Sequence, residues 1–394
     1  MNTAVIIYEG MADRPSSELD QRTPMEMARC PAATKLTVMG CGGQLTAFRG
    51  EDDYRPEAMC GRFCDLSADE IDRLWRGPLE ALGAGVDGAT SDWIFRADFV
   101  TMDGDRMIDP NVRGLSLQET ESLTAAITEA LPHSVIELAV VGPGRVVARA
   151  PGSQAAGIHS VPPHRFQGDT IASAWPRYRK LTWFRQWVEA AREVLASHPV
   201  NEVRLDLGEN PANALWPWGG GKRLMPREKP LSDTVFASNS SMAAGLAKYL
   251  GTDMVLLADP WAREKGKPKA FRIAPLVQAL HRAEHAVVFI ESEQLGGRYG
   301  RPSDKVWALE RLDHAFLAPL LTVLDAHKPN RVALCTSSAV SAESGRWFKS
   351  RLPFVVAGEG IEPDGVGHWD EAACEGGDFG AMDAAGLLQQ LRKE

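Results

Sequence analysis

The chain of 394 residues lacks any apolar run as long as the ~18 residues that span a bilayer, and its first residues show no signal-like pattern. Acidic residues also outnumber basic residues, and the formal net charge at pH 7 is -9. Binding to nucleic acid requires a basic face, so we expect neither a nucleic-acid nor a membrane partner. These absences predict a cytoplasmic globular protein.

Cysteine is scarce, with six in the whole chain and no pair at CxxC spacing. A small number of dispersed thiols is typical of a reducing compartment, and it disfavours both a disulfide scaffold and a structural zinc site. The six cysteines are Cys30, Cys41, Cys60, Cys64, Cys335 and Cys374.

Several apolar stretches with the character of strands end in acidic or small polar residues. TAVIIY precedes Glu9, AVVFI precedes Glu291, and VALC precedes Thr336, Ser337 and Ser338. In an open parallel sheet, ligands bind beyond the carboxyl ends of the strands. These positions are therefore the first place to look for chemistry.

Strand-like runs alternate with helical patterns along most of the chain, which predicts an α/β fold with a mostly parallel sheet flanked by helices. Thr23 and Pro24 are expected to be the N-cap and first residue of an early helix. A smaller inserted α+β domain is indicated by three strand-like stretches separated by GDR and GPG turns. They are WIFRADFVTM, SVIELAVV and RVVARA. We place the core at residues 1–94 and 175–394 and the insertion at residues 95–174.

Several motifs then occur in one order along nearly the whole chain. They are GMADRP from Gly10, RTPMEMARCP, RGPLEALGAGV from Arg76, FRADFVT from Phe95, HPVNEVRLDLGENPANALWPWGGG from His198, KVWALERLD from Lys305 and LPFVVAGEGIEPDGVGHWDE from Leu352. Together they resemble the archaeal-type cofactor-independent phosphoglycerate mutases of the alkaline phosphatase superfamily. The resemblance implies an alkaline phosphatase-like core in which two metal ions activate a serine nucleophile and hold the phosphoryl group.

The residues that the family uses for this chemistry are largely replaced. The aspartate that ends the family's first strand is Glu9 here, although Asp13 is kept, and Ala58 falls near the position of the serine nucleophile. Cys60 reaches that position only if the gap in the alignment is shifted. No serine is available there.

The second metal site of the family has also lost its ligands by this comparison. Gln294 and Arg298 stand for an aspartate and a histidine, Ser337 and Ser338 stand for an Asp-His pair, and the last histidine falls at about Trp347. Two closely spaced divalent ions need anionic or imidazole ligands to offset dehydration. We therefore expect no metal cofactor of the two-ion kind and no active two-metal phosphomutase.

The residues expected to bind phosphate are better preserved. A guanidinium grips phosphate or carboxylate in bidentate fashion, and glycine backbone N–H groups can cradle an anion, although these glycines also suit a tight loop. The candidate ligand-binding residues are Arg76, Arg96, Arg204, Arg298, Gly219 and Gly220, with Arg145 and His164 as weaker matches.

Two hypotheses follow. In the first, the chain is a divergent phosphoglycerate mutase-like protein that binds a small phosphorylated or carboxylated ligand or a partner protein. In the second, it is an enzyme, either an active mutase or a related phosphotransferase, with Glu9 and Cys60 as the catalytic candidates. A single magnesium or manganese ion would then be held by some of the carboxylates Glu9, Asp13, Glu291 and Glu293.

Overall fold

The computed structural model describes residues 3–46, 55–112, 114–131, 135–158, 160–173, 182–257, 263–264, 267–268, 274–280, 282–291, 301–327 and 331–393. The chain forms two compact units. Unit 1 comprises residues 1–71, 227–243 and 250–394, and unit 2 comprises residues 72–226 and 244–249. No described helix is both long and apolar enough to cross a membrane.

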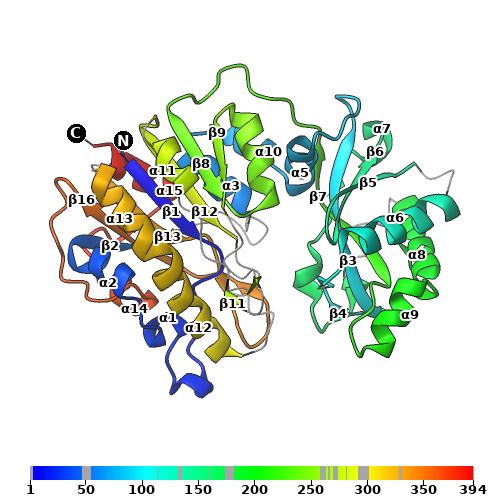
Figure 1. Cartoon of the computed structure of the whole chain (residues 1–394), viewed down its shortest axis with the longest axis horizontal. Coiled ribbons are helices and arrows are strands. Elements are labelled where there is room, and N and C mark those ends of the chain that lie inside the picture. Colours follow the sequence, from blue (N-terminus) through cyan, green and yellow to red (C-terminus); the bar gives the residue numbers. More distant parts are fainter. Residues whose placement is uncertain are drawn as a thin grey trace. The chain divides into compact units, whose positions relative to one another are not determined.

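Unit 1 is built on an eight-stranded sheet with the strand order β17-β2-β16-β13-β1-β12-β8-β9 (Figure 1). Strands β13, β1, β12, β8 and β9 are parallel neighbours, while β16 runs antiparallel between β13 and β2. The strands are β1 (Thr3–Tyr8), β2 (Gly40–Leu45), β8 (Thr234–Ser238), β9 (Asp253–Leu256), β12 (His285–Ile290), β13 (Arg331–Thr336), β16 (Leu352–Gly358) and β17 (Ala381–Met382).

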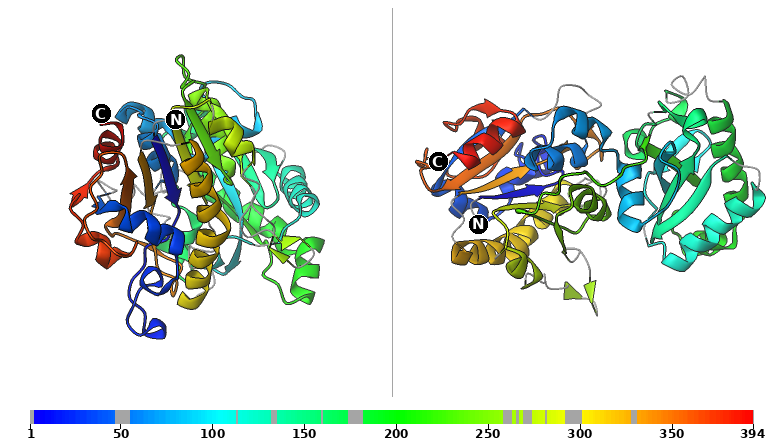
Figure 2. Two further views of the ribbon diagram at one scale, coloured as in Figure 1. Left: turned by 60° about the vertical axis from the view of Figure 1, so that its left-hand side comes forward. Right: turned by 90° about the horizontal axis from the view of Figure 1, so that it is seen from above.

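Helices cover both faces of this sheet; α15 lies on one face and α13 on the other (Figure 2, right). Every residue of β1, β12 and β13 is buried, as continuous apolar strands between two helical layers should be. The helices with residues in unit 1 are α1 (Pro24–Met27), α2 (Pro31–Val38), α3 (Pro56–Phe63), α4 (Ala68–Arg73), α10 (Ser241–Leu250), α11 (Ala274–Leu280), α12 (Pro302–Leu312), a π-helix (Asp313–Leu317), α13 (Ala318–His327), α14 (Glu371–Glu375) and α15 (Ala384–Arg392).

Shorter elements complete unit 1. They are the 3₁₀ turn η1 (Ser17–Leu19) and the two-stranded ribbons β10 (Arg263–Glu264) with β11 (Lys267–Pro268) and β14 (Ala339–Val340) with β15 (Trp347–Phe348). At the start of α1, Thr23 caps the helix and Pro24 is its first residue, as predicted; Glu26 completes a capping box.

Unit 2 is an antiparallel sheet around the long strand β3 (Trp93–Asp103). Strands β6 (Arg145–Ala150) and β7 (Ala214–Lys222) pair with β3, which also pairs with β4 (Arg106–Asp109), and β5 (Glu137–Gly142) pairs with β6. The predicted strands before and after the GDR and GPG turns therefore exist. The helical elements are α5 (Arg76–Ala84), α6 (Leu117–Ala130), α7 (Gly152–Ala155), η2 (Pro163–Phe166), η3 (Ile171–Ser173), α8 (Thr182–Ala196) and α9 (Pro199–Asp206).

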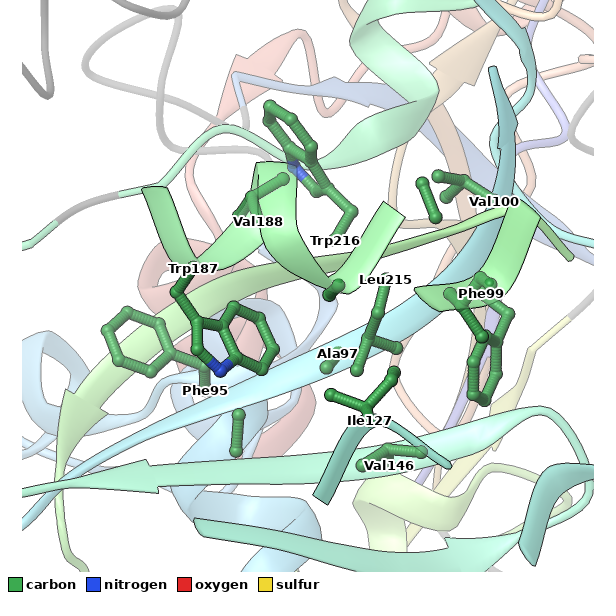
Figure 3. Packing of buried hydrophobic residues seen from close by; sticks show 14 of the residues in the cluster. Phe95, Ala97, Phe99, Val100, Ile127, Val146, Trp187, Val188, Leu215 and Trp216 are labelled. Atoms are coloured by element: carbon green, nitrogen blue, oxygen red, sulfur yellow. The ribbon is translucent and has the colours of Figure 1, made fainter. Parts of the chain in front are cut away.

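The two faces of β3 have different character. Phe95, Ala97 and Phe99 belong to a buried apolar cluster that also contains Trp187 and Val188 of α8 (Figure 3). The alternate residues Ile94, Arg96 and Asp98 therefore lie on the other face. There Ile94 packs with Ala81 of α5, and the polar network described below is found.

The boundaries predicted at residues 95 and 174 both fall inside unit 2. Strand β7 comes after the predicted insertion in the sequence, but it pairs with β3 along Trp93–Val100. A long-range strand pairing of this kind leaves no trace in local composition, and it ties the motif around Gly219 to the smaller unit.

Helix α5 lies directly on the backbone of β3 because its second residue is glycine. A Cβ atom added at Gly77 would be 2.5 Å from the carbonyl carbon of Phe95 and 2.6 Å from the amide nitrogen of Arg96. Backbone atoms in a sheet cannot move aside cheaply. Gly77 therefore sets how closely α5 approaches the sheet.

We predict that Gly77→Ala lowers the free energy of unfolding of unit 2 by about 2 kcal/mol, because overpacking forces the backbone to shift. Denaturant unfolding followed by circular dichroism measures the change. Gly367→Ala is the control, since a Cβ atom there meets nothing within 4 Å. Equal, small effects of both substitutions would contradict this account of α5 packing.

Candidate functional site

The carboxyl ends of the parallel strands in unit 1 bring the predicted acidic and hydroxyl residues to one edge of the sheet. Tyr8 pairs with Ile290 on one side and with Thr336 on the other, so the next residues along are Glu9, Glu291 and Ser337. The sequence prediction that these residues share an edge is thus met by the strand register.

A hydroxyl anchors the turn that follows β1. The hydroxyl of Thr336 donates to the carbonyl oxygen of Tyr8 at 2.9 Å and accepts from the amide of Met11 at 3.1 Å. Beyond it, the hydroxyl oxygens of Ser337 and Ser338 are buried and have no hydrogen-bond partner among the residues that the structure describes. The end of β13 therefore supplies neutral hydroxyls where a carboxylate and an imidazole were expected in the family.

Asn239 extends the pairing of β8 and β12 beyond the ends of the strands. Its side-chain nitrogen donates to the carbonyl oxygen of Glu291 at 2.7 Å, and its side-chain oxygen accepts from the amide of Glu291 at 2.8 Å. This reciprocal pair fixes the backbone of Glu291, the residue that follows the last pair of β1 and β12 in the register.

Asp13 is engaged by a buried lysine of α12. The ammonium of Lys305 donates to an oxygen of Asp13 at 3.1 Å, to the carbonyl oxygen of Ala12 at 3.1 Å and to that of Val340 at 2.7 Å. The same Asp13 oxygen accepts from the amide of Ala342, and the other accepts from the amide of Arg14. Burial lowers the pKa of Lys305, while the nearby Asp13 carboxylate opposes that shift.

Cys60 lies in α3 with no exposed surface. Burial raises the pKa of its thiol well above the usual range, and the nearby Cys64 and Glu57 add to the increase. Glu9 contributes in the same direction, which places Glu9 near Cys60. A buried, protonated thiol is a poor nucleophile, so its environment does not favour the catalytic role considered for Cys60.

In unit 2, two of the predicted arginines meet at one buried carboxylate. Arg76 and Arg96 both donate to the same oxygen of Glu80, at 2.8 and 2.9 Å. Arg96 also donates to Asp98 at 2.7 Å, and the indole nitrogen of Trp218 donates to the second oxygen of Asp98 at 2.6 Å.

The neighbouring arginines keep the carboxyl group of Glu80 ionised. Burial alone would raise the pKa of Glu80, but Arg96 and Arg76 outweigh burial, and with a smaller contribution from Arg145 they lower it to about 2. Arg145 thus lies within electrostatic range of Glu80, which Arg76 and Arg96 contact directly.

An aromatic pair borders the same cluster. The guanidinium of Arg96 lies 5.4 Å from the ring centre of Trp218, and the ring of His164 meets Trp218 edge-on at 6.1 Å between centres. His164, a weaker candidate from the sequence, is therefore a neighbour of the arginine cluster.

Arg204 makes different contacts from the other two arginines. It donates to the carbonyl oxygen of Asn210 at 2.8 Å and forms an ion pair with Glu209 at 3.2 Å. These bonds hold the turn after α9 and favour a structural role for Arg204.

Gly219 and Gly220 lie in strand β7 and not in a tight loop, which was one of the two interpretations of the sequence. The register of β3 and β7 shifts between Ile94 and Arg96, which is a β-bulge opposite these glycines. A Cβ atom at Gly219 would be 2.9 Å from that of Arg76, and one at Gly220 would be 2.4 Å from the ring of Phe95. Gly219 therefore allows close packing against Arg76, and Gly220 allows close packing against Phe95 on the apolar face of β3.

Other predicted positions add little or lie outside the described ranges. Trp347 is in β15, and its indole offers no metal ligand. Arg298, Glu293 and Gln294 are outside the described residues. Within those residues, no three His, Cys, Asp or Glu side chains form a potential metal-binding group.

Sequence reasoning missed the residues that hold the candidates in place. Glu80 was detectable, because it follows Arg76 by four positions in a helix, and Asp98 follows Arg96 by two on the same face of a strand. Lys305 gave no such signal, because Asp13 and Ala12 lie 292 and 293 residues away in the sequence and Val340 lies 35 residues away.

Comparisons with known proteins agree on one family. A family profile described as 2,3-bisphosphoglycerate-independent phosphoglycerate mutase matches residues 75–201. A protein of that name from Methanothermobacter thermautotrophicus is 28% identical, covering 99% of this chain and 96% of the relative. One from Methanosarcina acetivorans is 27% identical over 100% of both chains.

Solved structures show the same fold. A protein of Pyrococcus horikoshii superposes with a TM-score of 0.68 at 20% identity, covering 100% of this chain and 98% of that one. The cofactor-independent phosphoglycerate mutase of Thermoplasma acidophilum gives a TM-score of 0.51 at 22% identity, covering 99% and 98%. The chain is thus similar over its full length to 2,3-bisphosphoglycerate-independent phosphoglycerate mutases of archaea, and it shares the fold of these solved structures.

Proposed function

We propose that this chain is a divergent phosphoglycerate mutase-like protein that has lost two-metal phosphoryl transfer and that binds a small anionic ligand. The observation that carries the proposed loss is the end of β13, where Ser337 and Ser338 stand next to Glu9. Uncharged hydroxyls cannot offset the dehydration of a divalent ion as a carboxylate and an imidazole do.

The carboxylate of Asp13 supports the same proposal. Both of its oxygens already accept hydrogen bonds, and the buried ammonium of Lys305 supplies the positive charge beside it. A metal ion at Asp13 would have to displace or approach this ammonium, at a cost in charge repulsion. The residues present therefore do not fit the pair of ions that the family uses, and no reaction step is derived through them.

The arginine cluster of unit 2 supports the proposal that the chain binds an anionic ligand. Arg76 and Arg96 are buried and paired, so their charge is largely used within the protein. Arg145 is partly exposed and sits close enough to lower the pKa of Glu80, so it adds positive charge at the border of the cluster. A phosphate or carboxylate group suits such a site, with Arg145 as the residue that contacts it.

A second candidate function rests on the register of β1 and β12. It places Glu9 beside Glu291 at the ends of adjacent parallel strands. Two neighbouring carboxylates could hold one magnesium or manganese ion with water as the remaining ligand. In that case the chain would be a mutase or related phosphotransferase with a rebuilt metal site.

We predict that calorimetric titration with manganese or zinc shows no binding of two equivalents at micromolar affinity. Glu291→Gln separates the two proposals, because it removes a carboxylate of the rebuilt site without changing the shape of the side chain much. One equivalent bound by the wild type and lost in Glu291→Gln would favour the single-ion site. Two equivalents at micromolar affinity would refute the proposed loss.

We further predict that interconversion of 2- and 3-phosphoglycerate stays at the no-enzyme rate with manganese, zinc or magnesium supplied. Each 1.36 kcal/mol of lost transition-state stabilisation costs about tenfold in rate, and the metals provide most of that stabilisation in this chemistry. A coupled enzymatic assay measures the rate. Activity above the control that disappears in Glu9→Gln would show that the site has been rebuilt.

For the anion site we predict that inorganic phosphate or 3-phosphoglycerate raises the melting temperature of the wild type by a few degrees. A ligand at 100 times its dissociation constant stabilises the folded state by roughly 2.7 kcal/mol. The shift should vanish in Arg145→Ala and persist in Arg149→Ala, a matched arginine on the same strand that pairs with Asp92. A shift that is absent in the wild type, or equal in both variants, would rule out this site.

A further inference from the structure

A pocket of about 510 Å³ lies beside helix α2 of unit 1, and none of the residues that line it belongs to the candidate site at the strand ends. Helix α2 contributes Pro31, Thr34, Lys35 and Val38, which are spaced i, i+3, i+4 and i+7 and therefore share one face of the helix. Pockets that hold small ligands have volumes of roughly 300–1,000 Å³. We call this cavity the α2 pocket.

Apolar groups form one part of the wall of the α2 pocket. Val38 and Met39, at the end of α2, both line it and are 58% and 56% exposed. Cys30, directly before α2, lines it as well. Burial raises the pKa of the Cys30 thiol, and the nearby Asp313 and Glu310 add to the increase. A protonated thiol behaves as a small apolar group, so all three side chains offer apolar contacts to an occupant.

Among the described residues that line the α2 pocket, the charged side chains are basic. They are Arg29 and Lys35, and His368 adds an imidazole. The guanidinium of Arg29 is exposed, and no described residue forms an ion pair or hydrogen bond with it. Lys35 pairs with Asp325 at 3.3 Å, but both side chains are largely exposed, and exposed pairs of this kind contribute little. The lining of the pocket is therefore positively charged, although the chain as a whole has a net charge of -9.

The carboxylates close to the α2 pocket bind backbone amides. Glu310 accepts from the amide of Arg29 at 3.0 Å. Asp313 accepts from the amides of Ala32 and Ala33 at 3.0 and 2.8 Å, so it occupies the N-terminus of α2. An anion in the pocket must therefore be bound by side chains, and Arg29 is the cation that has no partner.

We propose that the α2 pocket binds a small amphipathic anion, namely a monocarboxylate with an apolar chain. Its carboxylate binds Arg29, since a guanidinium can hold a carboxylate by two parallel hydrogen bonds, and its chain contacts Val38 and Met39. Eight residues line the pocket, whereas a standard protein interface uses roughly 20–30 residues on each side, which favours a small molecule over a partner protein. The anion site proposed at Arg145 lies in unit 2 and is a separate site.

The test uses octanoate, which combines a carboxylate with an apolar chain, and octanol, which has the same chain without the charge. Calorimetric titration of the full-length protein should show tighter binding of octanoate than of octanol. Arg29→Gln should weaken octanoate binding roughly tenfold, because it removes a charge-assisted hydrogen bond, and should leave octanol binding unchanged. Arg282→Gln is the matched control, because the side chain of Arg282 is 73% exposed in unit 1 and does not line the pocket.

Cys30 provides a readout at the pocket itself. It is partly exposed while the other five cysteines are buried, so brief alkylation with iodoacetamide, followed by mass spectrometry, reports on Cys30. Octanoate at its wild-type dissociation constant should slow this alkylation in the wild type and in Arg282→Gln, but not in Arg29→Gln. Octanoate binding that leaves Cys30 unprotected would place the ligand elsewhere and overturn the proposal. Absence of binding, equal affinity for octanol, or equal weakening by Arg282→Gln would also overturn it.

Discussion

The backbone pairing of β1 with β12 and β13 is the constraint on which the candidate site of unit 1 depends. The three strands are parallel, in register and buried along their whole length, so their carboxyl ends coincide. That coincidence alone brings together residues that are hundreds of positions apart in the sequence. The chemistry of the edge is then decided by whichever side chain follows each strand. In this chain those side chains are two glutamates and a serine pair, so the edge carries carboxylates next to neutral hydroxyls.

In unit 2 the candidate site depends on side-chain ion pairs more than on the pairing of strand ends. Its sheet is antiparallel, and one face of β3 is an ordinary apolar core. The other face is polar and buried, and it is held by Glu80 between two arginines. Removing one partner of a buried ion pair typically lowers the free energy of unfolding by about 3–5 kcal/mol, because the remaining charge has no water to solvate it. The arginines that suggested a phosphate site are therefore also structural residues, and the proposed anion site assigns the contact with the ligand to Arg145.

Much of this fold could be predicted from the sequence. Apolar strands followed by Glu9 and Glu291 indicated a parallel sheet, Thr23 and Pro24 marked a helix start, and the GDR and GPG turns marked the hairpins of unit 2. Local patterns and ordered motifs carry this information directly. They could not indicate that β7 joins the sheet of unit 2, that Gly219 lies at a bulge, or that Lys305 reaches Asp13. Each of these depends on contacts between distant segments, and such contacts are set by packing of the whole unit.

Lys305 also has a consequence for how unit 1 can be observed in solution. Its side chain is 1% exposed and all three of its ammonium hydrogens have acceptors, so amine-reactive reagents cannot reach it in the native state. Reaction requires the first turns of α12 to separate from the segments that contain Asp13 and Val340. Most lysines are exposed and are labelled whether or not the protein opens. Lys305 is thus a natural reporter of local opening at the centre of unit 1, and its labelling rate gives the free energy of that opening without any engineered probe.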